Sequence, residues 1–520
     1  MRPLQRRCPG GRMSPEPSHG MTLQQLQDRG VGIGIAGLAS QTVYGVQHDS
    51  REVTGGDLFV AVPGETYDGL SFAGDAVARG AVAVMAERRI ELDVPQLLVK
   101  DIRGELGRAA ELVYGEPTSA LHTVGITGTN GKTTTAYLLQ RALEGVAAKP
   151  ALVGTTGWIA PGSERPSLHT TPEGDDLSRF AKLALDAGAT HLVLEVSSHG
   201  LALHRVDALD FEVAAFTNLS RDHLDFHESM ERYGEAKARL FTELRPKCAV
   251  IHVDDTFGSA LAHRIPGPVI RCSRKSGSRA EILATDWSVK RAGIRATFET
   301  PAGPIEIRSP MLGEHNLENL LVALGCAYAL GLDLNLVSKA WESATGSPGR
   351  LERVAHPEDV AVLVDYAHTP EALRTALQTM RAVTPRRLIA VFGAGGDRDK
   401  GKRPEMGRVG VEGADLCILT SDNPRSEDPS QILDEVAAGA EQAGGTPIEA
   451  TKLSDARRGY CRLTGRREAI AAAIRAARPG DTVLLAGKGH ENYQIVGAER
   501  QHFDDREEAR AVIASLAGGE

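Results

Sequence analysis

Several residue types that mark other classes of protein are scarce in this chain. It has 6 cysteines in 520 residues, scattered and without CxxC spacing, so neither a disulfide framework nor a structural zinc site is expected. Aromatic residues make up only 4% of the chain, which gives no support to a surface that stacks the bases of single-stranded nucleic acid. The formal charge of −9 argues against a polyanionic macromolecule as the main partner, because binding its phosphates needs a basic face.

Long apolar runs are missing as well. No run approaches the roughly 20 residues that a membrane-spanning helix needs, so no membrane span is expected. Residues 1–20 are basic and rich in proline and glycine but lack the apolar stretch of a signal peptide, and we expect a disordered extension there. Together these features predict a soluble protein of a reducing compartment, the cytoplasm.

What the chain does contain is ordinary globular sequence, long enough for about three domains. Hydrophobic residues make up 42% of it and charged residues 24%. Changes in the residue pattern along the chain predict a first domain at 21–121, a central one at 122–350 and a third at 351–520. Strand-like runs alternate with helical ones, which predicts an α/β fold with a mostly parallel central sheet and a Rossmann-like third domain. The clearest strand-like runs cover 57–62, 122–127, 191–196, 213–217 and 360–365.

A glycine-rich turn follows the run 122–127. It consists of Gly128, Thr129, Asn130, Gly131, Lys132, Thr133 and Thr134. Glycines let backbone N–H groups face phosphate oxygens, and the helix predicted from Lys132 to Leu143 adds a favourable dipole. Lys132 can reach the terminal phosphates of a nucleotide, and the Thr133 hydroxyl suits Mg²⁺. A strand-to-helix turn without a ligand is the alternative, because Ile126 stands where the general P-loop has glycine; by itself the turn indicates ATP or GTP.

Two polar residues lie where further strands are predicted to end. Glu195 closes the run 191–196, and His223 comes shortly after the run 213–217. The carboxyl edge of a parallel sheet is where α/β proteins bind ligands. Taken singly, Glu195 is typical of a solvated strand end and His223 of a hydrogen-bonding loop residue. The phosphate loop upstream favours a Mg²⁺ site made by both together with Thr133.

Three segments now occur together and in order: the phosphate loop, Glu195-Val196-Ser197-Ser198-His199-Gly200, and Asn218-Leu219-Ser220-Arg221-Asp222-His223-Leu224-Asp225. This set resembles the Mur ligase family. The family's phosphate loop has the pattern GxxGKT[TS], which needs no glycine at position 126 and so explains Ile126. The resemblance covers nearly all of 21–520. It implies an ATP-dependent acid–amino-acid ligase that adds meso-diaminopimelate to UDP-N-acetylmuramoyl-L-alanyl-D-glutamate through an acyl phosphate.

The same resemblance implies roles for single residues. Lys237, in Tyr233-Gly234-Glu235-Ala236-Lys237, matches a lysine that is carbamylated and becomes an anionic ligand of Mg²⁺; without the resemblance it would be read as an exposed helix lysine. The implied catalytic set is Lys132, Glu195, His223 and Lys237, and the implied metal ligands are Thr133, Glu195, His223 and the Lys237 carbamate. The implied ATP contacts beyond the loop are Asn316, at the start of an apolar helix expected at 317–330, and Arg350, Asp365 and His368.

The UDP-muramoyl dipeptide is expected on two segments of the first domain and on part of the central one. The matching residues are His48, Ser50, Glu65, Thr66, Tyr67, Thr170, Thr171, Ser197 and Arg205. Tyr67 is larger than the residue expected there, and Leu203 stands where a glutamine is often found, so one expected hydrogen bond is lost.

In the third domain, four apolar runs are each followed by a polar segment. The polar segments are 365–370, 393–403, 421–425 and 487–491. All would lie along the carboxyl edge of one sheet. Asp422-Asn423-Pro424-Arg425 resembles the family's recognition motif for diaminopimelate, in which an arginine pairs with the carboxylate that lysine lacks. Arg398, Gly487 and Glu491 match further diaminopimelate contacts. Without the resemblance, 422–425 would be read as an Asn-Pro turn with surface charges.

Three alternatives stay open at this point. One is another Mur-type or folylpolyglutamate-type ligase with a different acceptor, against which the 422–425 motif argues. Another is a P-loop NTPase acting as a switch or motor on protein or nucleic acid, which would need a basic surface. The third is a non-catalytic relative that only binds nucleotide. We expect small-molecule substrates, ATP and Mg²⁺ as partners and cofactors.

Overall fold

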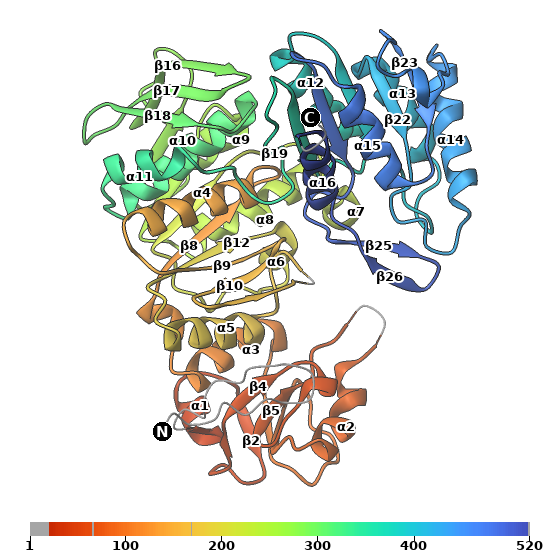
Figure 1. Ribbon diagram of the computed structural model, residues 1–520. Coiled ribbons are helices and arrows are strands. Elements are labelled where there is room, and N and C mark those ends of the chain that lie inside the picture. Colours follow the sequence, from red (N-terminus) through yellow and green to blue (C-terminus); the bar gives the residue numbers. More distant parts are fainter. Residues whose placement is uncertain (1–19, 65–66, 168, 518–520) are drawn as a thin grey trace, which may run out of the picture. The chain divides into compact units, whose positions relative to one another are not determined.

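The structure, a computed structural model, describes residues 20–64, 67–167 and 169–517. These residues form two compact units (Figure 1). The first comprises the described residues up to Ala284 together with Phe298–Ile305 and Glu318–Ala340. The second comprises Thr285–Thr297, Glu306–Leu317 and the described residues from Trp341 onward. The division into three domains at 121 and 350 stays a prediction.

The first unit begins with a five-stranded sheet in the order β2-β7-β6-β5-β4. The strand predicted at 57–62 is β5, Asp57–Val60, and three of its four residues are buried. Strands β4 to β7 are parallel, and β2 is antiparallel to β7. The other bounds are β2 Gly34–Ala36, β4 Gly45–Gln47, β6 Ala83–Ala86 and β7 Gln96–Leu98.

A large sheet follows, in the order β11-β10-β9-β12-β8-β13-β14-β15-β16-β17-β18. Strands β9, β12, β8, β13, β14 and β15 are parallel neighbours, as predicted for alternating strands and helices. The runs predicted at 122–127, 191–196 and 213–217 form β8 His122–Thr127, β12 His191–Glu195 and β13 Val213–Phe216. The remaining bounds are β9 Pro150–Gly154, β10 Gly157–Ala160, β11 Ser163–Arg165, β14 Cys248–His252, β15 Val269–Ser273, β16 Ile282–Lys290, β17 Gly293–Glu299 and β18 Ile305–Ser309.

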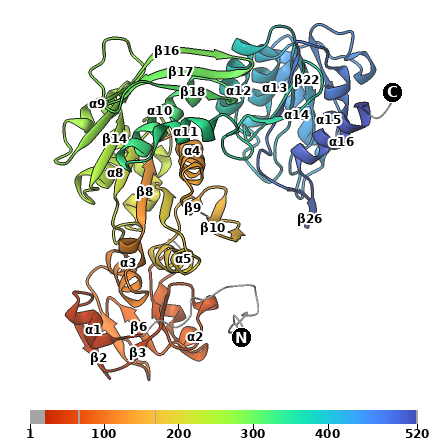
Figure 2. The ribbon, with the colours of Figure 1, turned by 60° about the vertical axis from the view of Figure 1, so that its left-hand side comes forward.

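Within the first unit, helices α3, Ile102–Val113, and α5, Gly174–Asp186, lie against each other between the five-stranded sheet and strands β8 and β9 of the large sheet (Figure 2). The contact is close because glycines face one another at the crossing. A Cβ added at Gly174 would lie 2.8 Å from the Cα of Gly107. The pairing of these helices therefore fixes the amino-terminal sheet on the central one.

The second unit contains a six-stranded sheet in the order β19-β20-β24-β21-β22-β23. All neighbours are parallel except β19 and β20, which confirms a Rossmann-like arrangement. The bounds are β19 Glu352–Val354, β20 Ala361–Asp365, β21 Leu388–Phe392, β22 Leu416–Leu419, β23 Gly459–Arg462 and β24 Thr482–Ala486. One apolar core forms under α12 Pro370–Val383, α13 Lys402–Gly413 and α14 Pro429–Gln442, and another under α15 Arg466–Ala476 and α16 Asp505–Ala517.

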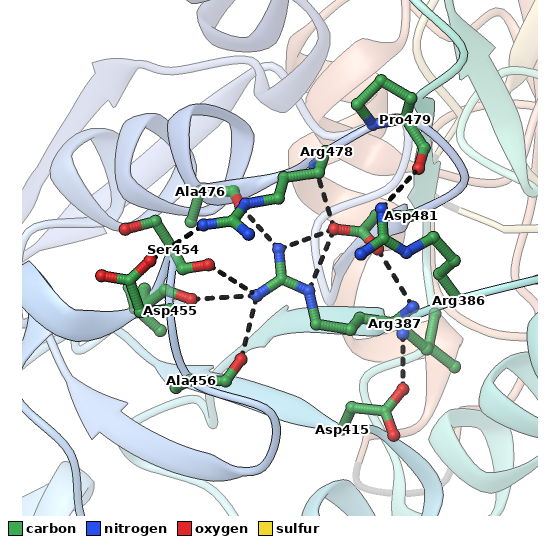
Figure 3. A network of polar contacts seen from close by, with 12 residues as sticks. Arg386, Arg387, Asp415, Ser454, Asp455, Ala456, Ala476, Arg478, Pro479 and Asp481 are labelled. Carbon is green, nitrogen blue, oxygen red and sulfur yellow. Dashed lines mark hydrogen bonds and ion pairs between the residues drawn. The ribbon is translucent and has the colours of Figure 1, made fainter.

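A partly buried arginine, Arg387, connects the amino ends of two central strands of this sheet (Figure 3). Arg387, just before β21, donates Nε and a terminal nitrogen to Asp481, just before β24, at 3.0 and 2.7 Å. Its other hydrogen bonds go to the carbonyl oxygens of Leu453, Ser454, Ala456 and Ala476. Arg387 thus stabilises the amino edge of this sheet, opposite the carboxyl edge where open α/β sheets bind ligands.

In the part of the chain that the structure describes, no helix combines the length and the apolarity needed to cross a membrane. Five cysteines lie in this part, and all are free thiols. Burial raises the pKa of the Cys461 thiol to about 11, so this thiol stays protonated near neutral pH.

Candidate active site

The phosphate loop bends sharply after β8 because two of its glycines adopt conformations that other residues avoid. Gly128 has φ +149°, and a Cβ there would lie 1.9 Å from Thr217 Oγ1. Gly131 has φ +87° and precedes helix α4, Lys132–Gly145. The predicted strand, turn and helix are therefore all present, and the first turn of α4 points its N–H groups at the loop.

The segment after β13 holds the loop from the side. The backbone N–H of Thr129 donates to the Asn218 carbonyl oxygen at 2.8 Å, and that of Asn130 donates to Asn218 Oδ1 at 3.0 Å. Lys132 folds back over the turn, and its Nζ donates to the carbonyl oxygens of Gly128 and Thr129 at 2.9 and 3.0 Å. The lysine ammonium thus lies over the turn, where nucleotide phosphates bind in P-loop proteins.

Glu195 ends β12 as a fully buried carboxylate. It accepts hydrogen bonds from Thr133 Oγ1 at 2.7 Å and from the backbone N–H and hydroxyl of Thr155 at 2.9 and 3.2 Å. Burial raises its pKa, and the nearby Lys132 ammonium partly offsets this effect. Thr155 was not predicted. It follows β9, the strand beside β12, so the rule that strand ends share one edge would have found it.

Lys237 lies on α8, Met230–Thr242, but it is not an exposed helix lysine. Only 1% of the residue is exposed. Its Nζ donates to the Gly128 carbonyl oxygen at 2.8 Å and lies 4.5 Å from the centre of the Tyr233 ring. Burial, reinforced by the nearby Lys132 charge, lowers the pKa of Lys237 well below its ordinary value. A neutral amine is the form that reacts with CO₂, so this environment suits carbamylation.

His223 lies farther from this group. It caps α7, Leu224–His227, in a left-handed conformation with φ +51°. Its ring centre is 4.9 Å from that of His199 and 6.1 Å from that of Tyr233. Tyr233 OH in turn lies 3.1 Å from Thr129 Oγ1. The structure therefore brings Thr133, Glu195 and Lys237 to one loop and links His223 to them through Tyr233.

The residues expected to bind the muramoyl dipeptide surround the end of β12. Thr171 Oγ1 donates to the Glu195 carbonyl oxygen and accepts from the Ser197 backbone N–H, both at 2.9 Å. Arg205 donates to the Thr171 carbonyl oxygen at 2.9 Å and pairs with Glu173 at 2.7 Å. Thr170 Oγ1 lies 3.1 Å from Thr155 Oγ1. Leu203 caps α6, Ser198–Ala202, where it makes no side-chain hydrogen bond.

Directly after β4 of the amino-terminal sheet, His48 pairs with an unpredicted partner. Its Nδ1 lies 2.9 Å from the buried Asp175 of α5. Burial disfavours the imidazolium, but the Asp175 carboxylate outweighs burial and raises the pKa of His48 to about 9. Ser50 starts a short 3₁₀ helix, Ser50–Glu52, and Tyr67 is 68% exposed. Glu65 and Thr66 lie outside the described residues.

The predicted nucleotide contacts of the second unit gather at the end of β20. Asp365 accepts hydrogen bonds from the backbone N–H groups of Leu351 and Ala367 at 2.8 and 2.9 Å. Burial raises the pKa of Asp365, and the Arg350 charge offsets part of this rise. Arg350 lies 5.2 Å from the Tyr366 ring centre, and His368 Nδ1 lies 2.9 Å from the Tyr366 carbonyl oxygen.

Asn316, the other predicted nucleotide contact, lies on a helix. It lies in the first turn of α10, Glu314–Ala329, which begins three residues before the predicted apolar helix. Its Nδ2 donates to the Leu312 carbonyl oxygen at 2.8 Å.

The predicted diaminopimelate residues lie along the carboxyl edge of the six-stranded sheet in the second unit. Arg425 has φ +51°, and it donates to the Gly396 carbonyl oxygen at 2.8 Å. A Cβ added at Gly395 would lie 3.1 Å from this guanidinium and 3.8 Å from Arg398 Cγ, so both arginines flank one glycine. Arg425 also pairs with the hairpin β25 Tyr493–Val496 and β26 Glu499–His502, through its backbone N–H to the Ile495 carbonyl oxygen at 3.1 Å.

The other predicted diaminopimelate residues, Asp422, Asn423, Pro424, Gly487 and Glu491, lie close to one another. Asn423 Nδ2 donates to Glu491 Oε2 at 3.1 Å. Gly487 has φ +120°, and a Cβ there would lie 3.9 Å from Asp422 Cγ. Pro424 is buried within the turn. The 422–425 segment is thus a buried, hydrogen-bonded turn at a sheet edge, unlike the surface turn that its composition alone suggests.

Comparison with known families agrees with this arrangement. The family model described as Mur ligase middle domain matches residues 126–327. The model for Mur ligase, glutamate ligase domain, matches residues 349–489, and that for Mur ligase family, catalytic domain, matches residues 42–115. These matches cover the phosphate loop and both sheets that carry the candidate site.

Known proteins are similar over nearly the whole chain. A UDP-N-acetylmuramoyl-L-alanyl-D-glutamate–2,6-diaminopimelate ligase of Geobacter metallireducens is 44% identical over 487 residues, covering 91% of this chain and 95% of the relative. A ligase of the same name from Trichormus variabilis is 42% identical over 92% of this chain and 95% of its own. A solved structure of a ligase with this name has a TM-score of 0.71 and 35% identity, and it covers 96% of this chain and 99% of that one. The chain therefore belongs to the Mur ligase family.

Proposed function

We propose that this chain is the ATP-dependent ligase that joins meso-diaminopimelate to UDP-N-acetylmuramoyl-L-alanyl-D-glutamate in cytoplasmic peptidoglycan precursor synthesis. Relatives at 42% and 44% identity carry this activity in their names. Within the chain, the observation that carries the proposal is the pair of arginines, Arg398 and Arg425, on either side of Gly395. Diaminopimelate has one carboxylate more than lysine, and a guanidinium group is the side chain best shaped to bind it.

The reaction begins with transfer of the γ-phosphoryl group of ATP to the free carboxylate of D-glutamate, which gives ADP and an acyl phosphate. The amine of diaminopimelate attacks the acyl carbon, loses a proton and displaces phosphate. Lys132 stabilises the charge on the oxygen atoms of the transferring phosphoryl group. To do so, its Nζ leaves the two loop carbonyl oxygens that it contacts at 2.9 and 3.0 Å and binds the phosphoryl oxygens instead.

The residues around Glu195 fit Mg²⁺. Glu195 and the Thr133 hydroxyl offer adjacent oxygen atoms, which are the ligands that Mg²⁺ prefers. The buried, low-pKa Lys237 suits conversion to a carbamate, whose anionic oxygen would be a further ligand. When bound, Mg²⁺ neutralises phosphate charge during transfer. His223 remains a predicted ligand, and Asn316, Arg350, Asp365 and His368 remain predicted nucleotide contacts.

Product analysis tests this proposal. The purified chain is incubated with the UDP-linked dipeptide, ATP, Mg²⁺ and diaminopimelate, and the product is identified by mass spectrometry. We expect one tripeptide and one phosphate for each ADP, and little ADP when diaminopimelate is left out. Tripeptide formation without ATP, or ATP turnover that ignores the acceptor, would refute the proposal.

A further inference from the structure

Lys488 is a buried lysine in the second unit that the proposed reaction does not use. None of its side chain is exposed. Its Nζ donates to Asn423 Oδ1 at 3.2 Å and to Glu491 Oε2 at 3.3 Å, and it lies 3.6 Å from Asp422 Oδ1. A buried ammonium group is costly unless it is paired, so this arrangement of three acceptors is specific.

Asn423 is held by its neighbours on both sides of its amide. Its Oδ1 accepts from Lys488 and from the Ile495 backbone N–H at 3.0 Å, which uses both lone pairs. Its Nδ2 donates to Glu491. The Asn423 amide therefore links Lys488 to Glu491 and fixes the direction of that carboxylate.

Asp422 differs from these neighbours. Only 9% of the residue is exposed, yet its Oδ1 has no hydrogen-bond partner among the described residues. Gly487 lies beside this carboxylate without a side chain, and a Cβ added there would be 3.9 Å from Asp422 Cγ. Among the described residues this oxygen is paired only with Lys488 Nζ, at 3.6 Å, which is too long for a hydrogen bond, so it is free to accept one from a ligand's donor.

We propose that Lys488 is a positioning residue of the acceptor site, where it fixes Asn423 and Glu491 and leaves Asp422 Oδ1 able to accept a hydrogen bond from the acceptor. This inference rests on the proposed function, because it concerns the group of residues to which that function assigns diaminopimelate. Lys488 acts through its neighbours and does not touch the reacting atoms.

Steady-state kinetics of Lys488→Met test the inference. Lys452→Met is the matched control, because Lys452 belongs to the same unit, pairs with Glu449 and is 69% exposed. We expect the KM for diaminopimelate to rise about tenfold or more in Lys488→Met, since hydrogen bonds to charged groups are lost. The KM for ATP should stay unchanged, and Lys488→Arg should recover part of the effect. An unchanged KM for diaminopimelate in folded Lys488→Met overturns the inference.

If Lys488→Met does not fold, Glu491→Gln is compared with the pair Lys488→Met/Glu491→Gln, which removes one charge of each sign. We expect a higher KM for diaminopimelate in the pair, because Asn423 Oδ1 has lost one of its two donors, and equal values overturn the inference. Failure of the proposed function and failure of the inference on Lys488 give different results. A wild-type chain that does not use diaminopimelate refutes the proposed function, whereas wild-type use with an indifferent Lys488 refutes only this inference.

Discussion

Replacing Arg466 with methionine removes one half of a buried ion pair that also supports the acceptor site. Arg466 donates Nε to Asp505 Oδ1 at 2.8 Å and a terminal nitrogen to Oδ2 at 2.6 Å, and both side chains are 0% exposed. The same guanidinium donates to the carbonyl oxygens of Ser421 and Ala486 at 3.3 and 3.0 Å. These two residues directly precede Asp422 and Gly487, so the clamp holds both acceptor loops.

The expected loss of stability is large. Methionine fills most of the arginine's volume but leaves the Asp505 carboxylate buried and unpaired, which costs about 3–5 kcal/mol. That is a large part of the roughly 5–15 kcal/mol by which a typical domain is stable. Arg467→Met is the matched control, because Arg467 pairs with Glu508 at 2.7 Å while 66% exposed. A pair so exposed is screened by solvent and contributes at most about 1 kcal/mol.

Urea unfolding followed by circular dichroism measures both variants. We expect Arg466→Met to lower the midpoint far more than Arg467→Met, and Arg466→Met/Asp505→Leu to recover most of the loss because no charge is left buried. Folded Arg466→Met should also show a raised KM for diaminopimelate and an unchanged KM for ATP. Equal midpoints for Arg466→Met and Arg467→Met would refute the reasoning.

Three further predictions concern other parts of the chain. Lys237→Arg keeps a cation but cannot form the carbamate, so kcat should fall on the order of 10²–10³-fold, and intact-mass analysis in bicarbonate should show one added CO₂ only in the wild type. Arg425→Lys should lower kcat/KM for diaminopimelate about tenfold to a hundredfold and leave the slow reaction with lysine unchanged, as product analysis with each acceptor would show. Folding raises the pKa of His48 from 6.5 to about 9. The ion pair with Asp175 therefore stabilises the folded state fully below pH 6.5, and this stabilisation is lost as the pH rises through about 9. His48→Leu should therefore cost stability at acidic pH and little at strongly alkaline pH, and equal losses in urea unfolding at both would contradict the assignment.

Local patterns were enough to predict the frame of the site. The run 122–127, the turn at Gly128 and the helix from Lys132 lie where the sequence placed them, because each depends on neighbours along the chain. The carboxyl-edge rule likewise predicted that 421–425 and 487–491 would lie together, and Gly487 does lie beside Asp422.

Contacts between distant parts of the chain could not be predicted in this way. The burial of Lys237 depends on α8 packing against the phosphate loop, 109 positions away in sequence. His48 meets Asp175 across 127 positions because α3 and α5 cross closely. Lys488 was missed because it stands between two glycines, where nothing in the sequence tells which way the side chain turns. Burial of charge depends on tertiary packing, which local sequence patterns do not reveal.

The central claim is that the second unit selects its acceptor by the carboxylate that distinguishes diaminopimelate from lysine. A single reaction containing the UDP-linked dipeptide, ATP and equal concentrations of meso-diaminopimelate and L-lysine tests it most directly, with both products resolved by mass. We expect product from diaminopimelate almost alone, by a ratio as large as ~10⁴ for a site that pairs a guanidinium with this carboxylate. Comparable amounts of the two products would contradict it.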